Sequence, residues 1–364
     1  YKRLCRLSFL KRIGARLFMA LNRNVKISLG ILLGLILFSC IGGTAYFAFR
    51  AYRKTEQLQD AMRAFERKEW TKARTLFRSV LASDRNNETA VVKLAELARM
   101  RGDPPEEAYY WFRAGKLNLL DRDYAVNYCD ALCRMRNFDA LAAFLRGVAP
   151  DSRTGRQSLQ FAFALHATGS EEEAASLEES APWTPLKPEN ADLAELVSVL
   201  FSKDDVPVER TMSALAELAN SKDDFVATES LLALANLQER GGAFAEAEKT
   251  LLGAVRRNEY AATPRLVALC ERRGDLTRVV ELLRVYLKKH PNPDLSVRFA
   301  ELLAATGRKD EIPAFAKALP QSDRRFILTG HYIDAILAFL ENDMEKLSRI
   351  LSLIRDEFQT HFPF

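Results

Sequence analysis

The four histidines are the first residues to test for chemistry, because imidazole is a frequent general base and metal ligand. His166, His290, His331 and His361 are scattered along the 364 residues, and the chain has no H-E-x-x-H or H-x-E pattern. Asp334 follows His331 closely, but no nucleophile accompanies the pair. No serine lies in G-x-S-x-G, and no phosphate-binding loop is present. The sequence therefore predicts no enzyme and no catalytic site, and we expect neither a cofactor nor a metal.

The cysteines also fail to form a reactive or metal-binding pattern. The chain has five of them, Cys5, Cys40, Cys129, Cys133 and Cys270, with no C-x-x-C pair. A small, odd number without paired spacing indicates neither a disulfide framework nor a zinc site. Cys129 and Cys133 lie four positions apart, which predicts two small apolar side chains on one face of a helix.

A step of about 34 residues organises the chain instead. A small or aliphatic residue is followed four positions later by a large apolar one at Ala73/Phe77, Ala108/Phe112, Ala140/Phe144, Ala247/Leu251, Val279/Leu283 and Leu347/Leu351. Ala174 and Ile312 fit this spacing less well, and a degraded unit near Met212 would divide the one long step. The steps between successive anchors are 35, 32, 34, 73, 32, 33 and 35 residues. A repeat of this length built from two helices is typical of a helical solenoid.

The pattern resembles the tetratricopeptide repeat (TPR) family, whose second helix opens with A-x3-F and whose unit ends near a proline. The first three anchor pairs match that motif, and Pro291 follows Leu283 at the closing position. No unit shows the first-helix motif W-x2-L-G-x2-Y. The resemblance implies an all-α, TPR-like α-solenoid of about eight to nine helical hairpins. Taken with the apolar stretch described below, it resembles the single-pass, membrane-anchored bacterial members of that family.

Breaks in the helical pattern divide the repeats into two blocks. Residues 55–180 form the first expected block and residues 191–364 the second. Between them, residues 181–190 contain Pro182, Pro185 and Pro188, which are incompatible with a helix interior. We expect this segment to be a boundary or a bend in the array.

The net charge of +5 belongs to one end of the chain. Residues 1–54 hold 11 of the 53 Lys and Arg residues and no Asp or Glu, so the remainder has 42 basic and 48 acidic residues, a net charge of −6. A mildly acidic repeat region repels phosphate backbones. We therefore expect no nucleic-acid partner.

The basic arm of residues 1–26 precedes an apolar stretch at residues 27–49, which contains 23 residues without a charge. A helix of that length is about 34 Å long, enough to cross a hydrocarbon layer of about 30 Å. We expect a single transmembrane helix with the N-terminus in the cytoplasm and the repeats on the periplasmic or extracytoplasmic side, because positive charges favour the cytoplasm. The chain begins on Tyr1, and Met19 is an alternative start that would leave two basic residues before the stretch and three after it, so the orientation depends on which start is used.

Two other interpretations of the apolar stretch stay open. Leu37-Phe-Ser-Cys40 resembles a bacterial lipid-attachment motif, although Phe38 is a poor fit, and a cleaved secretory signal would have a shorter apolar region. Gly30 and Gly34 form a G-x-x-x-G pattern, which can bring two membrane helices close and would then give a homodimer, although glycine is also common in membrane helices without that role.

The resemblance also implies where partners would bind, because the first helix of each TPR unit lines the concave face. The family's groove positions transfer to Met62, Glu96, Arg99, Cys129, Phe163, His166, Asn236, Glu239 and Glu301. Family members that bind a C-terminal carboxylate carry Lys and Asn there, and only Asn236 matches. A mixed apolar and acidic groove favours an amphipathic helix or extended peptide of another protein.

The sequence thus predicts a non-enzymatic, membrane-anchored scaffold that binds protein or peptide partners in a membrane or envelope complex. Two alternatives are a cytoplasm-facing adaptor, and a regulatory subunit whose catalytic site lies on another chain.

Overall fold

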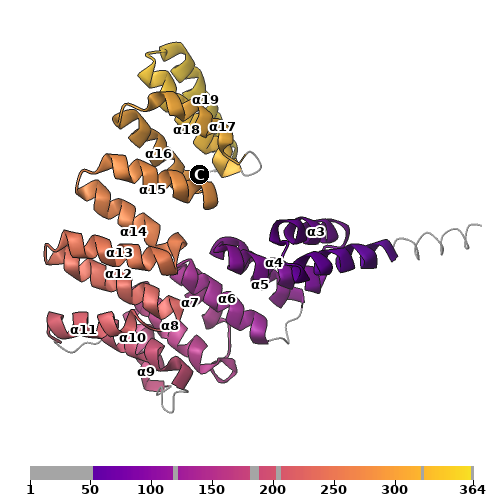
Figure 1. Cartoon of the computed structure of the whole chain (residues 1–364), viewed down its shortest axis with the longest axis vertical. Helices are drawn as coiled ribbons and strands as arrows, with labels where there is room; N and C mark the ends of the chain where they lie inside the picture. Colours follow the sequence, from indigo (N-terminus) through magenta and orange to yellow (C-terminus); the bar gives the residue numbers. More distant parts are fainter. Residues whose placement is uncertain (1–51, 118–121, 181–187, 202–205, 321–323, 362–364) are drawn as a thin grey trace, which may run out of the picture. The chain divides into compact units, whose positions relative to one another are not determined.

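The computed structural model describes residues 52–117, 122–180, 188–201, 206–320 and 324–361 (Figure 1). Within these ranges the chain is helical apart from turns, and it contains no strand. Residues 52–66 form a helix. The helices that follow are α3 (Trp70–Ser83), α4 (Glu88–Arg101), α5 (Pro104–Leu117), α6 (Arg122–Arg134), α7 (Phe138–Arg146), α8 (Gly155–Ala167), α9 (Glu171–Ser180), α10 (Ala191–Phe201), α11 (Val208–Leu218), α12 (Asp224–Arg240), α13 (Phe244–Arg257), α14 (Glu259–Arg272), α15 (Leu276–Lys289), α16 (Pro293–Ala305), α17 (Ile312–Ala318), α18 (Arg324–Leu340) and α19 (Met344–His361). Three short 3-10 helices lie at Pro150–Ser152, Pro188–Asn190 and Lys309–Glu311.

Two compact units divide the chain, the first ending at Lys93 and the second beginning at Leu94. In the first unit, helix 52–66 packs against α3 around Ala73 and Phe77, both fully buried. The ring of Phe65 lies 5.4 Å from that of Trp70 and 6.3 Å from that of Phe77, in edge-to-face geometry. These contacts make one helical hairpin, as the spacing of its apolar residues predicts.

The second unit consists of further hairpins in which consecutive helices pack together. Within hairpins, contacts join α6 to α7, α8 to α9, α12 to α13, α14 to α15 and α18 to α19. The contacts of α5 with α6 and of α7 with α8 join one hairpin to the next. The first helices of successive hairpins also touch, from α6 to α8, α8 to α10, α10 to α12, and α12 to α14. Each helix thus buries its apolar stripe against both its own partner and the next hairpin, which is how a solenoid hides surfaces that one hairpin leaves exposed.

Eight hairpin turns of the described residues repeat the same backbone conformation. The described residues with positive φ are Lys68, Gly102, Arg136, Gly169, Gly242, Gly274, Gly307 and Asn342. At Gly274 (φ 75°), the Gly274 N–H donates to the carbonyl of Glu271 at 2.9 Å and the Asp275 N–H donates to that of Cys270 at 3.0 Å. This is the Schellman motif, which satisfies the last carbonyls of a helix, and the other seven turns show the same pair of bonds. Successive turns are 34, 34, 33, 73, 32, 33 and 35 residues apart, so the backbone repeats with the period read from the side chains.

The anchor residues of the second helices are mostly buried, with shifts at three hairpins. Ala247, Leu251, Val279 and Leu283 are buried as predicted. In α5 and α19 the large buried residue comes three positions after the anchor, so the residues four positions after it are 41% and 51% exposed (Phe112 and Leu351). In α7 the buried pair is Leu141 and Leu145, one position after the predicted one. Positions i+3 and i+4 lie on the same helical face, so the pattern alone does not choose between them.

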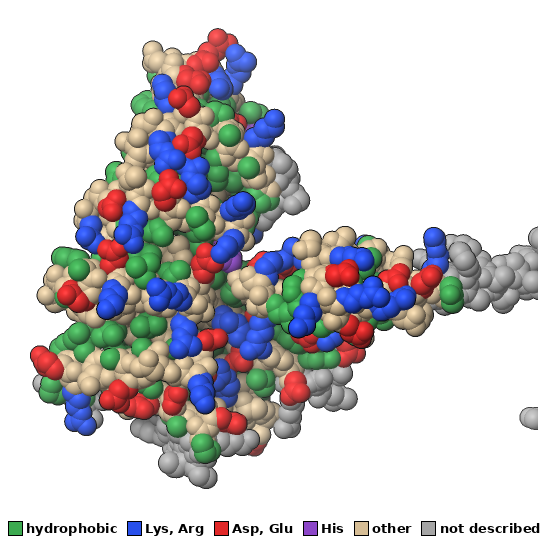
Figure 2. All heavy atoms as spheres, viewed as in Figure 1, with side chains coloured by type: hydrophobic (Ala, Val, Ile, Leu, Met, Phe, Trp, Pro, Cys, Tyr) green, Lys and Arg blue, Asp and Glu red, His purple; other side chains and the backbone are tan. Residues whose placement is uncertain are grey.

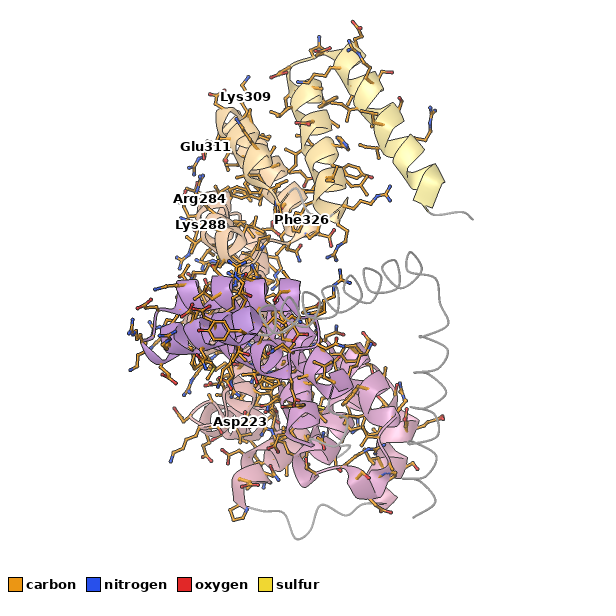
Figure 3. All side chains as sticks on the ribbon, turned by 90° about the vertical axis from the view of Figure 1, so that its right-hand side faces the viewer. Asp223, Arg284, Lys288, Lys309, Glu311 and Phe326 are labelled. Carbon is orange, nitrogen blue, oxygen red and sulfur yellow. The ribbon has the colours of Figure 1, made fainter. Side chains whose placement is uncertain are left out.

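Salt bridges link neighbouring hairpins towards the C-terminal end. Arg284 pairs with Glu311 at 2.6 Å, and both residues are labelled in Figure 3. Arg308 pairs with Glu281 at 2.7 Å, and each of the two pairs spans 27 residues. Acidic and basic side chains are interspersed in this way over the visible face of the described chain (Figure 2). Exposed pairs of this kind contribute only about 0–1 kcal/mol each, so apolar packing provides most of the stability between hairpins.

Several sequence predictions fall outside the described residues. These are the arm at 1–26, the apolar stretch at 27–49 with Gly30 and Gly34, and residues 181–187 of the proline-rich segment. Among the residues that the structure does describe, no helix combines the length and the apolar character needed to cross a membrane.

Candidate functional site

The candidate site lies where hairpins that are not neighbours in sequence come together, within α6–α14, which we call the closed segment. Phe138 at the start of α7, Phe163 in α8 and Phe225 in α12 form an aromatic cluster. The ring of Phe163 lies 5.2 Å from each of the other two, and Phe138 lies 6.4 Å from Phe225. All three are buried. The cluster therefore ties α12 to α7 and α8, across the intervening hairpin of α10 and α11.

A buried carboxylate lies beside this cluster. Arg136 occupies the left-handed position of the α6–α7 turn, and its Nε lies 2.8 Å from Oε1 of Glu229, across 93 residues. Glu229 is 4% exposed. Burial raises the pKa of Glu229, and the positive charge of Arg136 partly opposes that rise. The Asn258 side chain also reaches this turn, donating from Nδ2 to the carbonyl of Arg134 at 2.7 Å.

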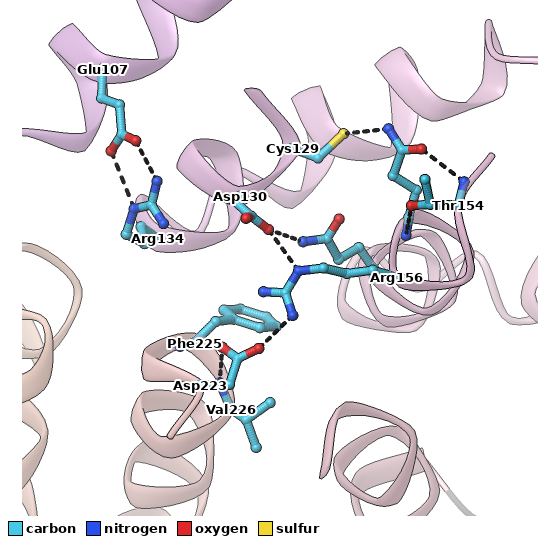
Figure 4. A network of polar contacts seen from close by, with 11 residues as sticks. Glu107, Cys129, Asp130, Arg134, Thr154, Arg156, Asp223, Phe225 and Val226 are labelled. Atoms are coloured by element: carbon cyan, nitrogen blue, oxygen red, sulfur yellow. Dashed lines mark hydrogen bonds and ion pairs between the residues drawn. The ribbon is translucent and has the colours of Figure 1, made fainter. Parts of the chain in front are cut away.

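A second polar network joins α6, α8 and the start of α12 (Figure 4). Arg156 lies between two carboxylates, with its Nε 2.9 Å from Oδ1 of Asp130 and its Nη1 bonded to Oδ2 of Asp223. Asp223 also caps α12, accepting from the Phe225 N–H at 2.9 Å. Burial alone would raise the pKa of Asp223, but the hydrogen bond and charge of Arg156 outweigh it and lower that pKa. Gln160 donates to Asp130 at 2.6 Å, which completes the link between α8 and α6.

These contacts leave a pocket of about 370 Å³ between the turn before α7 and helices α8, α10, α12 and α14. Its lining residues are Arg136, Phe138, Phe163, Ala167, Leu200, Phe201, Glu229, Leu232, Ala233, Asn236 and Arg265. Three aromatic rings and several aliphatic side chains surround a few polar groups, which is the usual make-up of a binding site.

The polar groups of the pocket differ in whether they have partners. Arg136 and Glu229 neutralise each other. The half-buried side chains of Asn236 and Arg265 take part in no hydrogen bond or ion pair with other described residues. The pocket thus offers an amide and one uncompensated positive charge.

Only some of the groove residues that the sequence predicts lie at the pocket. Phe163 and Asn236 line the pocket. His166 lies next to it, stacked on Phe201 with ring centroids 4.6 Å apart. Glu239 pairs with Arg272, and Glu301 is exposed and 3.0 Å from Arg298.

The remaining predicted positions lie away from the pocket lining. Met62 belongs to the first unit, Glu96 is half-buried and Arg99 is exposed. Cys129 is fully buried, and its Sγ accepts from Nε2 of Gln157 at 3.8 Å. Burial raises the pKa of Cys129 to about 12, so this thiol belongs to the core and carries no reactive thiolate.

Sequence reasoning missed Arg136, Phe201, Glu229 and Arg265. Only Arg136 left a usable signal, because five of the eight equivalent turns have glycine at its left-handed position. A non-glycine residue in that conformation is a reason to examine its side chain, which at Arg136 is bonded to Glu229. The other three lie on helices with nothing in their local pattern to mark them.

Paired helices, a period near 34 residues and an inner pocket formed by the first helices of the hairpins define this chain as a TPR-like helical solenoid. No protein-family model matches the sequence, and no curated protein matches it either. Among solved structures, it is similar to yeast Tom70, with 12% identity over 85% of this chain and 70% of that one and a TM-score of 0.30. It is also similar to PilF of Pseudomonas aeruginosa (11% identity, 76% and 96% coverage, TM-score 0.26) and to PilW, a type IV pilus biogenesis factor (14%, 82% and 98%, TM-score 0.26). Such weak likenesses decide neither a family nor a function.

Proposed function

We propose that this protein is a membrane-anchored TPR-like scaffold that binds segments of partner proteins on the inner face of its closed segment. The pocket between α8, α10, α12 and α14 carries the proposal. Its aromatic rings, the free amide of Asn236 and the guanidinium of Arg265 offer apolar surface and directed polar contacts. A solenoid presents such a surface to a helix or extended peptide without any chemical step.

The anchor rests on the sequence, in the uncharged residues 27–49 behind a basic arm. Confinement to a membrane raises the effective concentration of the repeats near other membrane proteins. We place the N-terminus in the cytoplasm and the repeats on the extracytoplasmic side, because the eight basic residues before the stretch outnumber the three that follow it.

Site-specific photo-cross-linking tests the binding function. Ala233 lines the pocket and is half-buried, so p-benzoylphenylalanine at this position should capture a partner in cells that make the protein. The matched control is Ala245, which is exposed on α13 and does not line the pocket. Cross-linked products specific to Ala233 support the scaffold, and their absence contradicts it.

Reporter fusions after residue 364 test the topology. An alkaline phosphatase fusion should be active and a green fluorescent protein fusion dark if the repeats are extracytoplasmic. The reverse result indicates a cytoplasm-facing adaptor, and release of the chain by alkaline carbonate extraction would contradict the anchor.

A further inference from the structure

We infer that the pocket of the closed segment takes an aromatic side chain from an internal acidic stretch of the partner, with a neighbouring carboxylate held by Arg265 and Asn236. This inference rests on the proposed function and specifies the chemistry of the partner.

The apolar part of the pocket fits a ring better than a flexible chain. Phe138 and Phe163 line one side and are already in contact at 5.2 Å, while Phe201 contributes a third ring. Phe201 is fixed by stacking on His166, with 7° between the ring planes. Aromatic pairs of this kind gain from edge-to-face or offset contacts beyond the apolar area they bury. A cavity of about 370 Å³ accommodates one large side chain with the backbone that carries it.

The charge of the pocket favours a negatively charged partner. Glu229 is already bonded to Arg136 and is 4% exposed, so it offers nothing to an incoming cation. Arg265 has no acidic partner among the described residues, and its planar guanidinium matches a carboxylate in two parallel hydrogen bonds. An acidic ligand would therefore supply the counter-charge that the protein leaves out.

The position of the two polar groups fixes where that carboxylate should lie. Asn236 is on α12 and Arg265 on α14, adjacent first helices that contact each other. The aromatic rings come from the α7, α8 and α10 side of the pocket. A peptide ring that packs against the α8 and α10 side of the pocket therefore leaves the neighbouring residue of the peptide facing α12 and α14. Nothing in this arrangement requires a free C-terminus.

Fluorescence anisotropy with the full chain in phospholipid nanodiscs tests the inference. The probe is a fluorescein-labelled, C-terminally amidated peptide, Gly-Ser-Asp-Glu-Trp-Glu-Asp-Ser-Gly. Two control peptides replace the four acidic residues by Lys or the Trp by Ala. Arg265→Gln should weaken binding of the acidic peptide by about tenfold or more, because hydrogen bonds to charged groups contribute about 1.5–3 kcal/mol. Phe201→Ala should weaken it as well. Arg240→Gln is the matched control, because Arg240 is exposed at the end of α12 and does not line the pocket.

Equal binding of the Lys and the acidic peptides, or equal affinities of Arg265→Gln and Arg240→Gln, would overturn the inference. Circular dichroism melting curves of each variant separate lost binding from lost folding. If cross-linking at Ala233 captures a partner but the acidic peptide neither binds nor competes, the inference fails and the scaffold function stands. If no partner is captured, the scaffold function itself fails.

Discussion

The closed segment (α6–α14) and the helices that follow it (α15–α19, here the linear segment) are built from the same hairpin and differ in which hairpins touch. In the linear segment, salt bridges such as Arg284–Glu311 join neighbouring hairpins across 27 residues. In the closed segment, Arg136 reaches Glu229 across 93 residues and Asn258 reaches Arg134 across 124. The comparison shows that a repeated local unit sets the period of a solenoid. The side chains on its inner face decide whether distant units also meet and form a pocket.

The largest difference between the two segments should follow a substitution in the aromatic cluster of the closed segment. Phe163→Ala removes a side chain that is 2% exposed and contacts three other rings, so we expect a loss of about 3–5 kcal/mol in unfolding free energy. Phe299→Ala in the linear segment is the matched control, since Phe299 is also 2% exposed and packs on Phe315. Urea denaturation should give similar losses for the two variants, but only Phe163→Ala should abolish cross-linking from Ala233. Loss of cross-linking in both would mean that the pocket depends on global stability alone.

The buried ion pair should give the next largest effect. Arg136→Ala leaves the carboxylate of Glu229 buried without a counter-charge, which we expect to cost about 3 kcal/mol, near the low end for buried pairs because Arg136 is partly exposed. Arg298→Ala breaks an exposed pair of the linear segment and should cost about 0–1 kcal/mol. Denaturation midpoints measure both. Equal losses of unfolding free energy in the two variants would contradict a buried ion pair in the closed segment that contributes more than an exposed one in the linear segment.

Acid should weaken the closed segment through Asp223. The pKa of Asp223 is lowered in the folded chain, so its ionised side chain stabilises the fold. This contribution to the unfolding free energy is fully present above the ordinary carboxyl pKa near 3.8, and it is lost as the pH falls through the lowered pKa of the folded chain. Asp223→Asn should therefore destabilise by about 2 kcal/mol at neutral pH, since it removes a hydrogen bond between charged groups. The deficit should shrink as the pH falls below about 4. Urea titrations at several pH values test this, and a deficit that does not change with pH would contradict the assigned role of Arg156.

The smallest effects should come from the turns. Asn342 and Lys68 hold the left-handed position with φ 58° and 60°, where glycine avoids a steric cost of about 1–2 kcal/mol. Because glycine also loses more entropy on folding, Asn342→Gly and Lys68→Gly should stabilise by less than about 1 kcal/mol. The same change at Arg136 should destabilise, because it also removes the partner of Glu229. Thermal melts of Arg136→Gly and Asn342→Gly would show whether one backbone position has opposite effects in the closed and linear segments, with Lys68→Gly as a further turn outside both.

The repeat of helical hairpins could be predicted from the sequence, because it depends on contacts between residues that are close along the chain. The anchor residues predicted a step of about 34 residues, and the left-handed turns of the structure repeat it, with glycine at Gly102, Gly169, Gly242, Gly274 and Gly307. The register of the second helices was wrong by one position at Phe112, Phe144 and Leu351, where neighbouring positions share a helical face.

The pocket could not be predicted in the same way. It depends on residues such as Phe138 and Phe225, which are far apart in the sequence and whose meeting leaves no periodic signal. Transfer of the family's groove positions found Phe163 and Asn236 but also pointed to the buried Cys129. The transferred positions assume a uniform array, whereas here the inner face is closed by its own side chains.

The buried thiols described above have a practical consequence for mapping this protein. Cys129, Cys133 and Cys270 are at most 2% exposed, and burial raises the pKa of each, so maleimides and oxidants have no thiolate to attack while the chain is folded. Once Cys5 and Cys40 are replaced, a single cysteine introduced on the surface would be the one site open to labelling. Scanning that site with a membrane-impermeant maleimide would test the proposed extracytoplasmic placement of the repeats, with every native core cysteine left in place.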